Sequence, residues 1–358
     1  MTNRKRSSPV RPQGRTLSSR GAIPGKRGRR PFRRLFPTTF VILGLVTGVF
    51  ISTIFGIYVV YAEMMSRVTY TGADIAYDSF YDIPDLMADY DPDQIGLKLP
   101  QGPGGDDFPV QTDDIQVRDM EGIENILLLG VDTSNYSGRS DVIMIISINH
   151  QTRKISIVSL MRAMYVTIGA RGHSRGLLNA AYAYGGAGLA IQTVEKNFGI
   201  PIKGFVAVNF RSFVNIVDAI GGVTINLTGA EGRVLGLPGG LNRLSGKQAL
   251  DYSRIRKIDD DFHRNQRQRN VINSVLNEMA SGGGASLYKA ATVILANTYT
   301  NLDLDGYITK APTYLAYERQ QLQLPDMSET RMYYVNGQEV WWFDMTKTHD
   351  RLTRFLTQ

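Results

Sequence analysis

The sequence predicts an α/β domain with a central sheet, preceded by one transmembrane helix. Short apolar runs with the length of buried strands recur from Ile123 onward, and helical segments alternate with them. No charged residue occurs between Arg34 and Glu63, which predicts the membrane helix. Of 358 residues 43% are hydrophobic, enough for a sizeable core, and the absence of cysteine excludes a disulfide scaffold, a thiolate metal site and a cysteine nucleophile.

Charge divides the chain into four parts. Residues 1–34 contain 12 Lys and Arg and no acid, whereas residues 63–120 contain 13 acids and 3 bases. We expect a basic, disordered cytoplasmic tail over 1–34, a transmembrane helix over 35–62, an acidic extracytoplasmic spacer over 63–120 and a folded domain over 121–358.

The predicted membrane helix contains an apolar run of 22 residues, from Phe40 to Tyr61. Such a run spans about 33 Å, enough for the hydrocarbon core of a bilayer. A cleaved signal peptide is the alternative, but its apolar region is shorter. The basic tail orients the N-terminus toward the cytoplasm, so we expect a single-pass type II protein of the cell membrane with its folded domain outside.

The spacer over 63–120 reads as a solvated tether with turn-forming Pro and Gly residues. Calcium binding is the alternative, although its Asp spacing matches no EF-hand loop.

The first half of the domain begins with three predicted strands, at 126–129, 142–148 and 155–160, because each is a short apolar run bounded by turn residues. Residues 177–184 and 187–198 read as helices that Gly185 and Gly186 interrupt.

In the second half, a strand at 205–208 precedes an amphipathic helix over 210–219, which Gly221 and Gly222 end. A strand at 223–227, a short helix opening at 245–251 and a long helix over 264–279 follow, and the last of these ends at glycines 282–284.

Two aspartates flank the first loop of the domain. Asp132 follows the first strand and Asp141 precedes the second, so the loop can return both carboxylates to one pocket. Without His or Cys nearby, such a pair suits a hard cation, Mg²⁺ or Mn²⁺. Two solvated loop aspartates are the alternative interpretation.

Arginines form the second candidate feature. Arg254 and Arg256 share one face of an extended segment, and the helical spacing of Arg264, Arg267 and Gln268 places them on one helix face. Together with Arg139 and Arg162, they could cradle a phosphate or pyrophosphate. Exposed, solvated arginines or salt bridges with Asp259, Asp260 and Asp261 are one alternative. A nucleic-acid surface is another, which the predicted external location weakens.

Other catalytic schemes find no support in the sequence. The four histidines lack zinc-ligand spacing, and GxSxG, P-loop and post-strand GxGxxG motifs are absent.

Five blocks of the sequence resemble, in order, the LytR–CpsA–Psr family of cell-envelope proteins. They are NILLLGVDTSNYSGRSDVIMIISIN (125–149), SLMRAMYV (159–166), LNAAYAYGG (178–186), VNFRSFVNIVDAIGGVTI (208–225) and LSGKQALDYSRIRKIDDDFHRNQRQRNVI (244–272). Weaker similarity continues from 300–308 to WWFD (341–344).

The resemblance implies a three-layer α/β/α sandwich with a central mixed sheet and an apolar pocket for a polyprenyl chain. It implies a phosphotransferase that moves a glycopolymer, such as a teichoic acid or a capsule, from a polyprenyl-pyrophosphate carrier to peptidoglycan at the membrane. No nucleic-acid partner is expected.

By match to the family motifs, Asp132 and Asp141 would hold Mg²⁺ or Mn²⁺. The residues expected to act on the pyrophosphate are Arg162, Arg139, Arg254 and Arg256, and those expected to bind substrate are Arg264, Arg267 and Gln268.

One position departs from the family pattern. The usual Pro-Arg-Asp tract after the third strand reads Met161, Arg162 and Ala163 here, so the acid beside the arginine is lost. A non-catalytic polyprenyl-phosphate-binding or regulatory protein therefore remains the alternative to an enzyme. A transcriptional attenuator would rest on the basic tail alone.

Overall fold

A computed structural model describes residues 115–358 except 134, 137, 169–174 and 336–337. The predicted tail, membrane helix and nearly all of the spacer lie outside these residues. In the part of the chain that is described, no helix is both long enough and apolar enough to cross a membrane.

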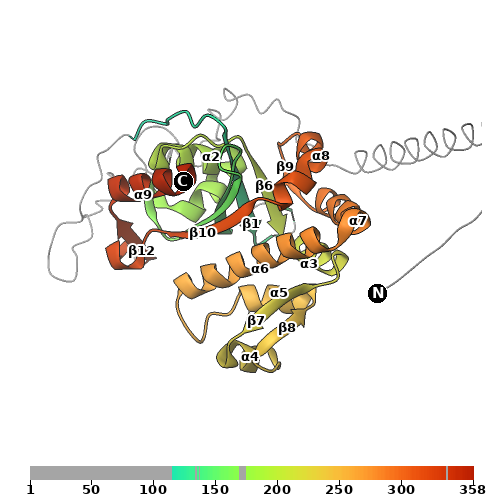
Figure 1. Cartoon of the computed structure of the whole chain (residues 1–358). Coiled ribbons are helices and arrows are strands. Elements are labelled where there is room, and N and C mark those ends of the chain that lie inside the picture. Colours follow the sequence, from blue (N-terminus) through green and yellow to red (C-terminus); the bar gives the residue numbers. More distant parts are fainter. Residues whose placement is uncertain (1–114, 134, 137, 169–174, 336–337) are drawn as a thin grey trace, which may run out of the picture. The chain divides into compact units, whose positions relative to one another are not determined.

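A six-stranded mixed sheet forms the centre of the domain (Figure 1), which confirms the predicted sheet. Its order is β10-β3-β2-β1-β6-β9, in which β10 pairs parallel with β3, β1 pairs parallel with β6, and the other pairs are antiparallel. The strands are β1 (Ile123–Val131), β2 (Ser140–Asn149), β3 (Lys154–Leu160), β6 (Gly204–Asn209), β9 (Tyr299–Thr300) and β10 (Glu318–Leu324).

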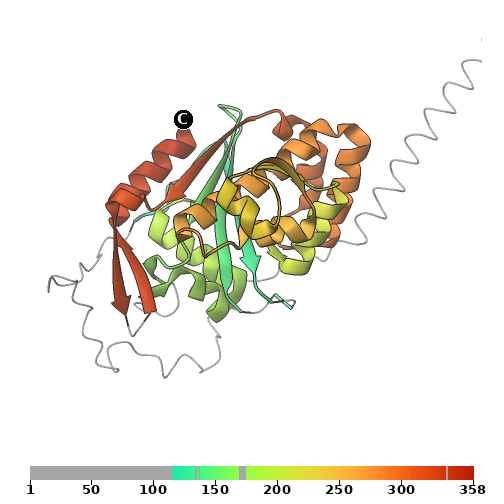
Figure 2. The same cartoon turned by 90° about the horizontal axis from the view of Figure 1, so that it is seen from below.

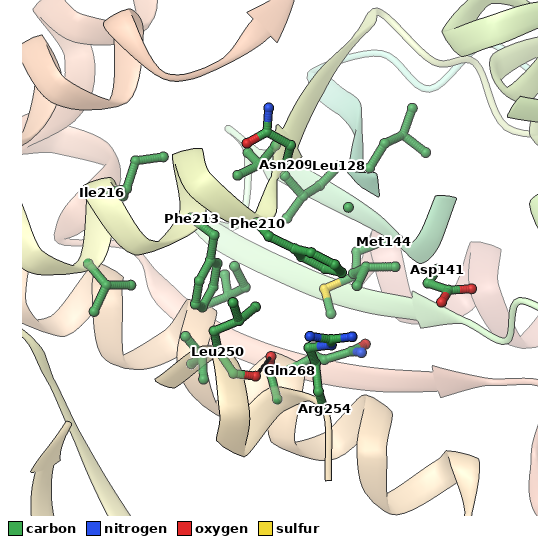
Figure 3. A pocket seen from close by; sticks show the side chains of 18 of the residues that line it. Leu128, Asp141, Met144, Asn209, Phe210, Phe213, Ile216, Leu250, Arg254 and Gln268 are labelled. Carbon is green, nitrogen blue, oxygen red and sulfur yellow. Dashed lines mark hydrogen bonds between the residues drawn. The ribbon is translucent and has the colours of Figure 1, made fainter. Parts of the chain in front are cut away.

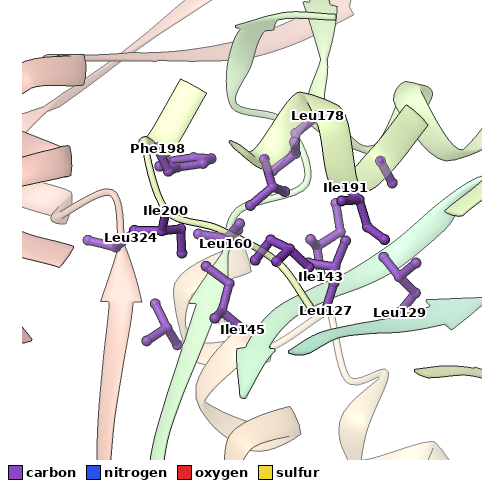
Figure 4. Close-up of a cluster of buried hydrophobic side chains, with 14 of the residues drawn as sticks. Leu127, Leu129, Ile143, Ile145, Leu160, Leu178, Ile191, Phe198, Ile200 and Leu324 are labelled. Carbon is purple, nitrogen blue, oxygen red and sulfur yellow. The ribbon is translucent and has the colours of Figure 1, made fainter. Parts of the chain in front are cut away.

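One face of the sheet packs against α2 (Leu178–Phe198) and α9 (Met345–Thr357). Alternate residues of β1, including Leu127 and Leu129, are fully buried in this core together with Ile145 and Phe198 (Figure 4). Gly185 and Gly186 have non-helical backbone angles inside α2, which confirms the interruption expected there.

The opposite face lies beneath α3 (Phe210–Ala219) and α6 (Asp261–Ser281), which completes three layers (Figure 1). Two further helices follow: α7 (Gly283–Ala296) packs against α3 and α6, and α8 (Leu304–Leu315) packs against α6. Asp260 is the N-cap residue of α6, and its side chain accepts a hydrogen bond from the backbone N–H of His263; Gly282 is the C-cap residue.

Smaller elements complete the domain around this central sheet and its helices (Figure 2). A hairpin of β7 (Val223–Leu227) and β8 (Gly240–Leu244), with α4 (Gly229–Leu235) and α5 (Gly246–Ser253), encloses a separate apolar cluster. The pairs β4 (Tyr165–Thr167) with β5 (Arg175–Leu177) and β11 (Thr330–Val335) with β12 (Gln338–Phe343) form two more small sheets, and a 3-10 turn occupies Met327–Glu329.

Candidate functional site: an apolar cavity with an arginine-rich end

A cavity of about 160 Å³ lies between the second face of the sheet and helices α3, α5 and α6 (Figure 3). We call it the apolar cavity, because aliphatic and aromatic side chains line most of it. The strands contribute Leu128, Val142, Met144 and Val208, and the helices contribute Phe210, Phe213, Ile216, Val217, Leu250, Val271, Ile272 and Val275.

The sequence of α6 explains why the cavity changes character along its length. Arg264, Gln268, Val271 and Val275 recur at helical spacing, so one stripe of α6 faces the cavity. Its first two members are polar and its last two are apolar. One end of the cavity is therefore charged and the rest suits a hydrocarbon chain.

The charged end is built from loops and helix starts that meet beside the beginning of β2. Arg162 Nη1 donates a hydrogen bond of 2.8 Å to Asp141 Oδ1, and Arg256 Nη2 lies 3.5 Å from Asp141 Oδ2. Arg162 Nε also lies 3.5 Å from Asp261 Oδ2, and Arg264 Nη1 lies 2.5 Å from Asp261 Oδ1. Three guanidinium groups thus share two carboxylates, which leaves positive charge available to an anion.

Burial and charge act in opposite directions on these groups. Burial alone would raise the pKa of Asp141, but its contacts with Arg162 and the charges of Arg256 and Arg264 hold the pKa below its usual value. Burial, with help from Arg162 and Arg256, lowers the pKa of Arg264 against the opposing effect of Asp261. Burial opposes the charged form of Arg162 as well, yet Asp141 and Asp261 raise its pKa.

Two more predicted residues line the same end. The guanidinium carbon of Arg254 lies 4.4 Å from the centre of the Phe210 ring, a cation–π contact that holds Arg254 at the cavity. Gln268 is buried and also lines the cavity. Figure 3 shows Asp141, Arg254 and Gln268 gathered away from Ile216, which marks the apolar end.

Asp132 and Arg139 lie in the exposed connection between β1 and β2. Val131 pairs with Ser140 in the sheet, so Asp132 and Asp141 emerge at the same end of the two strands. Gly138 closes this connection at a φ of 95°, and a Cβ there would lie 2.9 Å from Asp132 Oδ1, so a larger residue would disturb that carboxylate.

The donor chemistry of Asp132 and Asp141 fits a magnesium ion that also takes oxygens from a bound phosphate, because Mg²⁺ is commonly held by one or two carboxylates plus substrate phosphates. Among the described side chains, no three His, Cys, Asp or Glu come together as a ligand set complete in itself.

Arg267 has a different environment from the one its spacing predicts. Its side chain is absent from the lining of the apolar cavity and is 3% exposed. Its two terminal nitrogens each lie 2.6 Å from an oxygen of Asp259, and it also contacts Glu231 at 3.4 Å and the carbonyl of Ile255 at 2.9 Å. Arg267 therefore braces α6 against α4 and the loop after α5, and the expected common face holds for Arg264 and Gln268 only.

The sequence reasoning missed Asp261 and Phe210 as parts of the site. The sequence indicates Asp261 only as a possible salt-bridge partner of the arginines, and in the structure it contacts both Arg162 and Arg264. Its place in the first turn of the helix that carries Arg264 was the available signal.

Comparisons with known proteins agree with this architecture. The family model described as the LytR_cpsA_psr family matches residues 105–355. The polyisoprenyl-teichoic acid–peptidoglycan teichoic acid transferase TagU of Oceanobacillus iheyensis is 40% identical over 208 residues, which are 53% of this chain and 62% of that protein. The same transferase of Bacillus subtilis is 35% identical over 51% of this chain and 61% of its own length.

A relative with a different name also matches. Biofilm regulatory protein A of Streptococcus mutans is 34% identical over 54% of this chain and 53% of its length. The matched region thus spans about three fifths or less of these curated relatives.

Solved structures share the fold. Protein gbs0355 of Streptococcus agalactiae superposes with a TM-score of 0.57 at 27% identity, covering 66% of this chain and 88% of that one. TagT of B. subtilis, at 24% identity and a TM-score of 0.56, covers 69% and 96% of the two chains and supports the fold alone.

Proposed function

Because the chain belongs to the LytR–CpsA–Psr family, we propose that it transfers a glycopolymer from a polyprenyl-pyrophosphate carrier to peptidoglycan. One observation carries the proposal: a single cavity joins an apolar interior to an end with surplus positive charge. A lipid pyrophosphate combines the same two properties, a hydrocarbon chain and a multiply charged headgroup. The names of the TagU relatives supply the donor and acceptor classes.

The reaction is a phosphoryl-type transfer. An acceptor hydroxyl oxygen bonds to the phosphorus that bears the glycopolymer, and the bridging P–O bond to the carrier phosphate breaks. Polyprenyl phosphate leaves with the electron pair, and the hydroxyl proton passes to solvent. Such reactions depend mainly on positioning and on neutralising the phosphate charge.

Each residue then has a definite role in the proposal. Arg254, Arg256 and Arg264 hold the pyrophosphate at the mouth of the cavity, and Arg162 supplies charge to the transferring phosphate, since guanidinium groups match phosphate oxygens. Arg139, in the β1–β2 connection, is the further arginine that acts on the pyrophosphate in this proposal. Gln268 hydrogen-bonds the headgroup.

We propose Mg²⁺, or Mn²⁺, at Asp132 and Asp141, where the ion would neutralise phosphate oxygens. The lowered pKa of Asp141 keeps it ionised for this role.

The proposed location is the outer face of the cell membrane, where both substrates meet. Residues 40–61 and the basic tail support a single-pass type II topology. A reporter fused after Gln358 that is active only outside the cytoplasm tests it.

The second candidate is a regulatory or carrier-binding protein, which Ala163 and the similarity to Biofilm regulatory protein A favour. Against it, Arg162 still meets two carboxylates, Asp141 and Asp261. An acid at position 163 is therefore not needed to orient this arginine.

A transfer assay separates the two candidates. The full-length protein in detergent is supplied with Mg²⁺, a synthetic polyprenyl-pyrophosphate glycan and peptidoglycan oligomers, and products are followed by mass spectrometry. A phosphodiester-linked product with release of polyprenyl phosphate is expected, and it should disappear with EDTA. Carrier binding without product, under conditions in which a catalytically active relative turns over, would favour the regulatory function.

A further inference from the structure

A second cavity, of about 500 Å³, lies beside the apolar cavity and is lined by charged, polar and apolar side chains together. The residues that matter here are Arg139, Arg162, Ala163, Asn179, Asp261 and Trp341. They come from the β1–β2 connection, the segment after β3, the start of α2, the start of α6 and β12.

Two ion pairs separate the cavities, which have no lining residue in common. Asp141 lines the apolar cavity and its partner Arg162 lines the second one; Arg264 and its partner Asp261 repeat this arrangement. The second cavity therefore begins where the charged end of the apolar cavity stops.

The position of the second cavity suits the acceptor, the molecule whose hydroxyl oxygen attacks the phosphorus. Attacking and leaving oxygens lie roughly in line across the transferred phosphorus. If the carrier chain occupies the apolar cavity, its phosphate leaves toward that cavity, and the acceptor must approach from beyond the arginines.

The lining favours a neutral polar ligand over a second anion. Asp260, Asp261 and Glu339 stand there with Arg139 and Arg162, so the wall has no surplus of positive charge. The apolar cavity's end, by contrast, is dominated by arginines. Sugars, which present hydroxyl and amide groups on a partly apolar ring, match such a wall better than phosphate does.

Two residues of this wall carry a buried polar side-chain atom that no described residue pairs with. Asn179 is 4% exposed, and its Oδ1 has no hydrogen-bond partner among the described residues; the same holds for Trp341 Nε1. Both positions are fixed, since Asn179 N donates to Arg162 O at 3.1 Å and Trp341 N donates to Ala163 O at 2.8 Å. Unpaired buried polar atoms are costly, and because both atoms are covered here, a ligand that pairs with them must displace the side chains around them.

We propose that the second cavity is the subsite for the acceptor saccharide, an amino-sugar unit of the peptidoglycan strand. The inference rests on the proposed function and deepens it. Ala163 is one of the lining residues and has a short side chain, so a longer side chain at this position should take up space in the cavity.

The first test fills the cavity. Ala163→Leu adds three carbons at the wall without removing a charge, and Ala316→Leu makes the same change at an exposed turn as a matched control. We expect Ala163→Leu to raise KM for the peptidoglycan oligomer about tenfold or more while the Kd of polyprenyl pyrophosphate changes less than about twofold. Ala316→Leu should alter neither. An unchanged acceptor KM in a folded Ala163→Leu protein overturns the subsite.

The second test needs no turnover. Trp341 and Trp342 are the two tryptophans of the chain, so Trp342→Phe leaves Trp341 as the fluorescent reporter at the cavity. A lipid-free peptidoglycan tetrasaccharide should give a saturable fluorescence change that Ala163→Leu, in the Trp342→Phe background, weakens about tenfold or more. No change with the tetrasaccharide, or one that Ala163→Leu leaves unaltered, contradicts the proposal.

The two tests also separate this inference from the proposed function. Wild-type protein that binds the tetrasaccharide at Trp341 but yields no product supports the subsite and removes the transferase. Product formation by the wild-type protein, with an unchanged acceptor KM in the Ala163→Leu variant, supports the transferase and refutes the subsite.

Discussion

Two buried arginines of α6, three residues apart, should respond in opposite ways to the same substitution. Arg264 lines the apolar cavity, and Arg267 joins an internal ion-pair network. We compare Arg264→Met with Arg267→Met, because Met keeps much of the side-chain volume and has a helix propensity close to that of Arg.

Arg264→Met should change the free energy of unfolding by no more than about 1 kcal/mol, in either direction, because the carboxylate that loses its partner is neither deeply buried nor left unpaired. Its partner Asp261 is 29% exposed and keeps Arg162 as a second partner, so little charge is left uncompensated. Burial and the neighbouring charges of Arg162 and Arg256 already disfavour the charged form of Arg264.

Arg267→Met should cost about 3–5 kcal/mol, because it leaves buried carboxylates without their cation. Asp259 and Glu231 are 19% and 9% exposed. For a domain of this size the loss corresponds to a melting temperature lower by roughly 6–20 °C.

Ligand binding should give the opposite ranking. Geranylgeranyl pyrophosphate, titrated by calorimetry at a temperature where both variants are folded, should bind Arg264→Met about 10- to 150-fold more weakly, as loss of a charge-assisted hydrogen bond of about 1.5–3 kcal/mol requires. The folded fraction of Arg267→Met should bind like wild type. Equal destabilisation by both substitutions, or unimpaired binding by Arg264→Met, would refute the assignment of the two arginines.

Three further predictions concern metal, pH and the apolar chain. Asp132→Ala and Asp141→Ala should each abolish the Mg²⁺-dependent part of turnover in a metal titration, and a normal Mg²⁺ response in the double variant would remove the metal assignment. Burial alone would raise the pKa of Glu124, but hydrogen bonds from Lys203 and other partners lower it from 4.5 to about 2. Its stabilising effect is therefore present above pH 4.5 and lost as the pH falls toward 2, so thermal unfolding of Glu124→Gln should depend less on pH across this interval, and equal slopes would contradict the prediction. Val275→Phe should narrow the apolar cavity and weaken binding of long polyprenyl pyrophosphates much more than that of a ten-carbon analogue, as competition binding can show.

The strands at the centre of the sheet could be predicted from the sequence because both of their faces are buried. The apolar runs at 126–129 and 142–148 fall within β1 and β2, and the helix expected over 210–219 matches α3. The edge strand β10 was not predicted, because its sequence ERQQLQL is largely polar. Its Gln320 bonds to Ser156 and to the carbonyl of Phe355, partners that only the folded chain brings together.

Most residues of the candidate site could also be predicted from the sequence. The types and order of residues indicated Asp141, Arg162, Arg254, Arg256, Arg264 and Gln268, and the structure brings these six together. Helical spacing also predicted Arg267 among them, but Arg267 pairs with Asp259 and Glu231 instead. Helical spacing indicates which face of a helix a residue occupies. Which carboxylate an arginine pairs with depends on tertiary contacts.

A crystal structure of the protein with a bound polyprenyl pyrophosphate tests the central claim most directly. We predict hydrocarbon density along Phe213, Val271 and Val275, with phosphate oxygens within hydrogen-bonding distance of Arg254, Arg256 or Arg264. A headgroup bound away from these arginines, or a chain that avoids the space between the sheet and α6, would contradict the account.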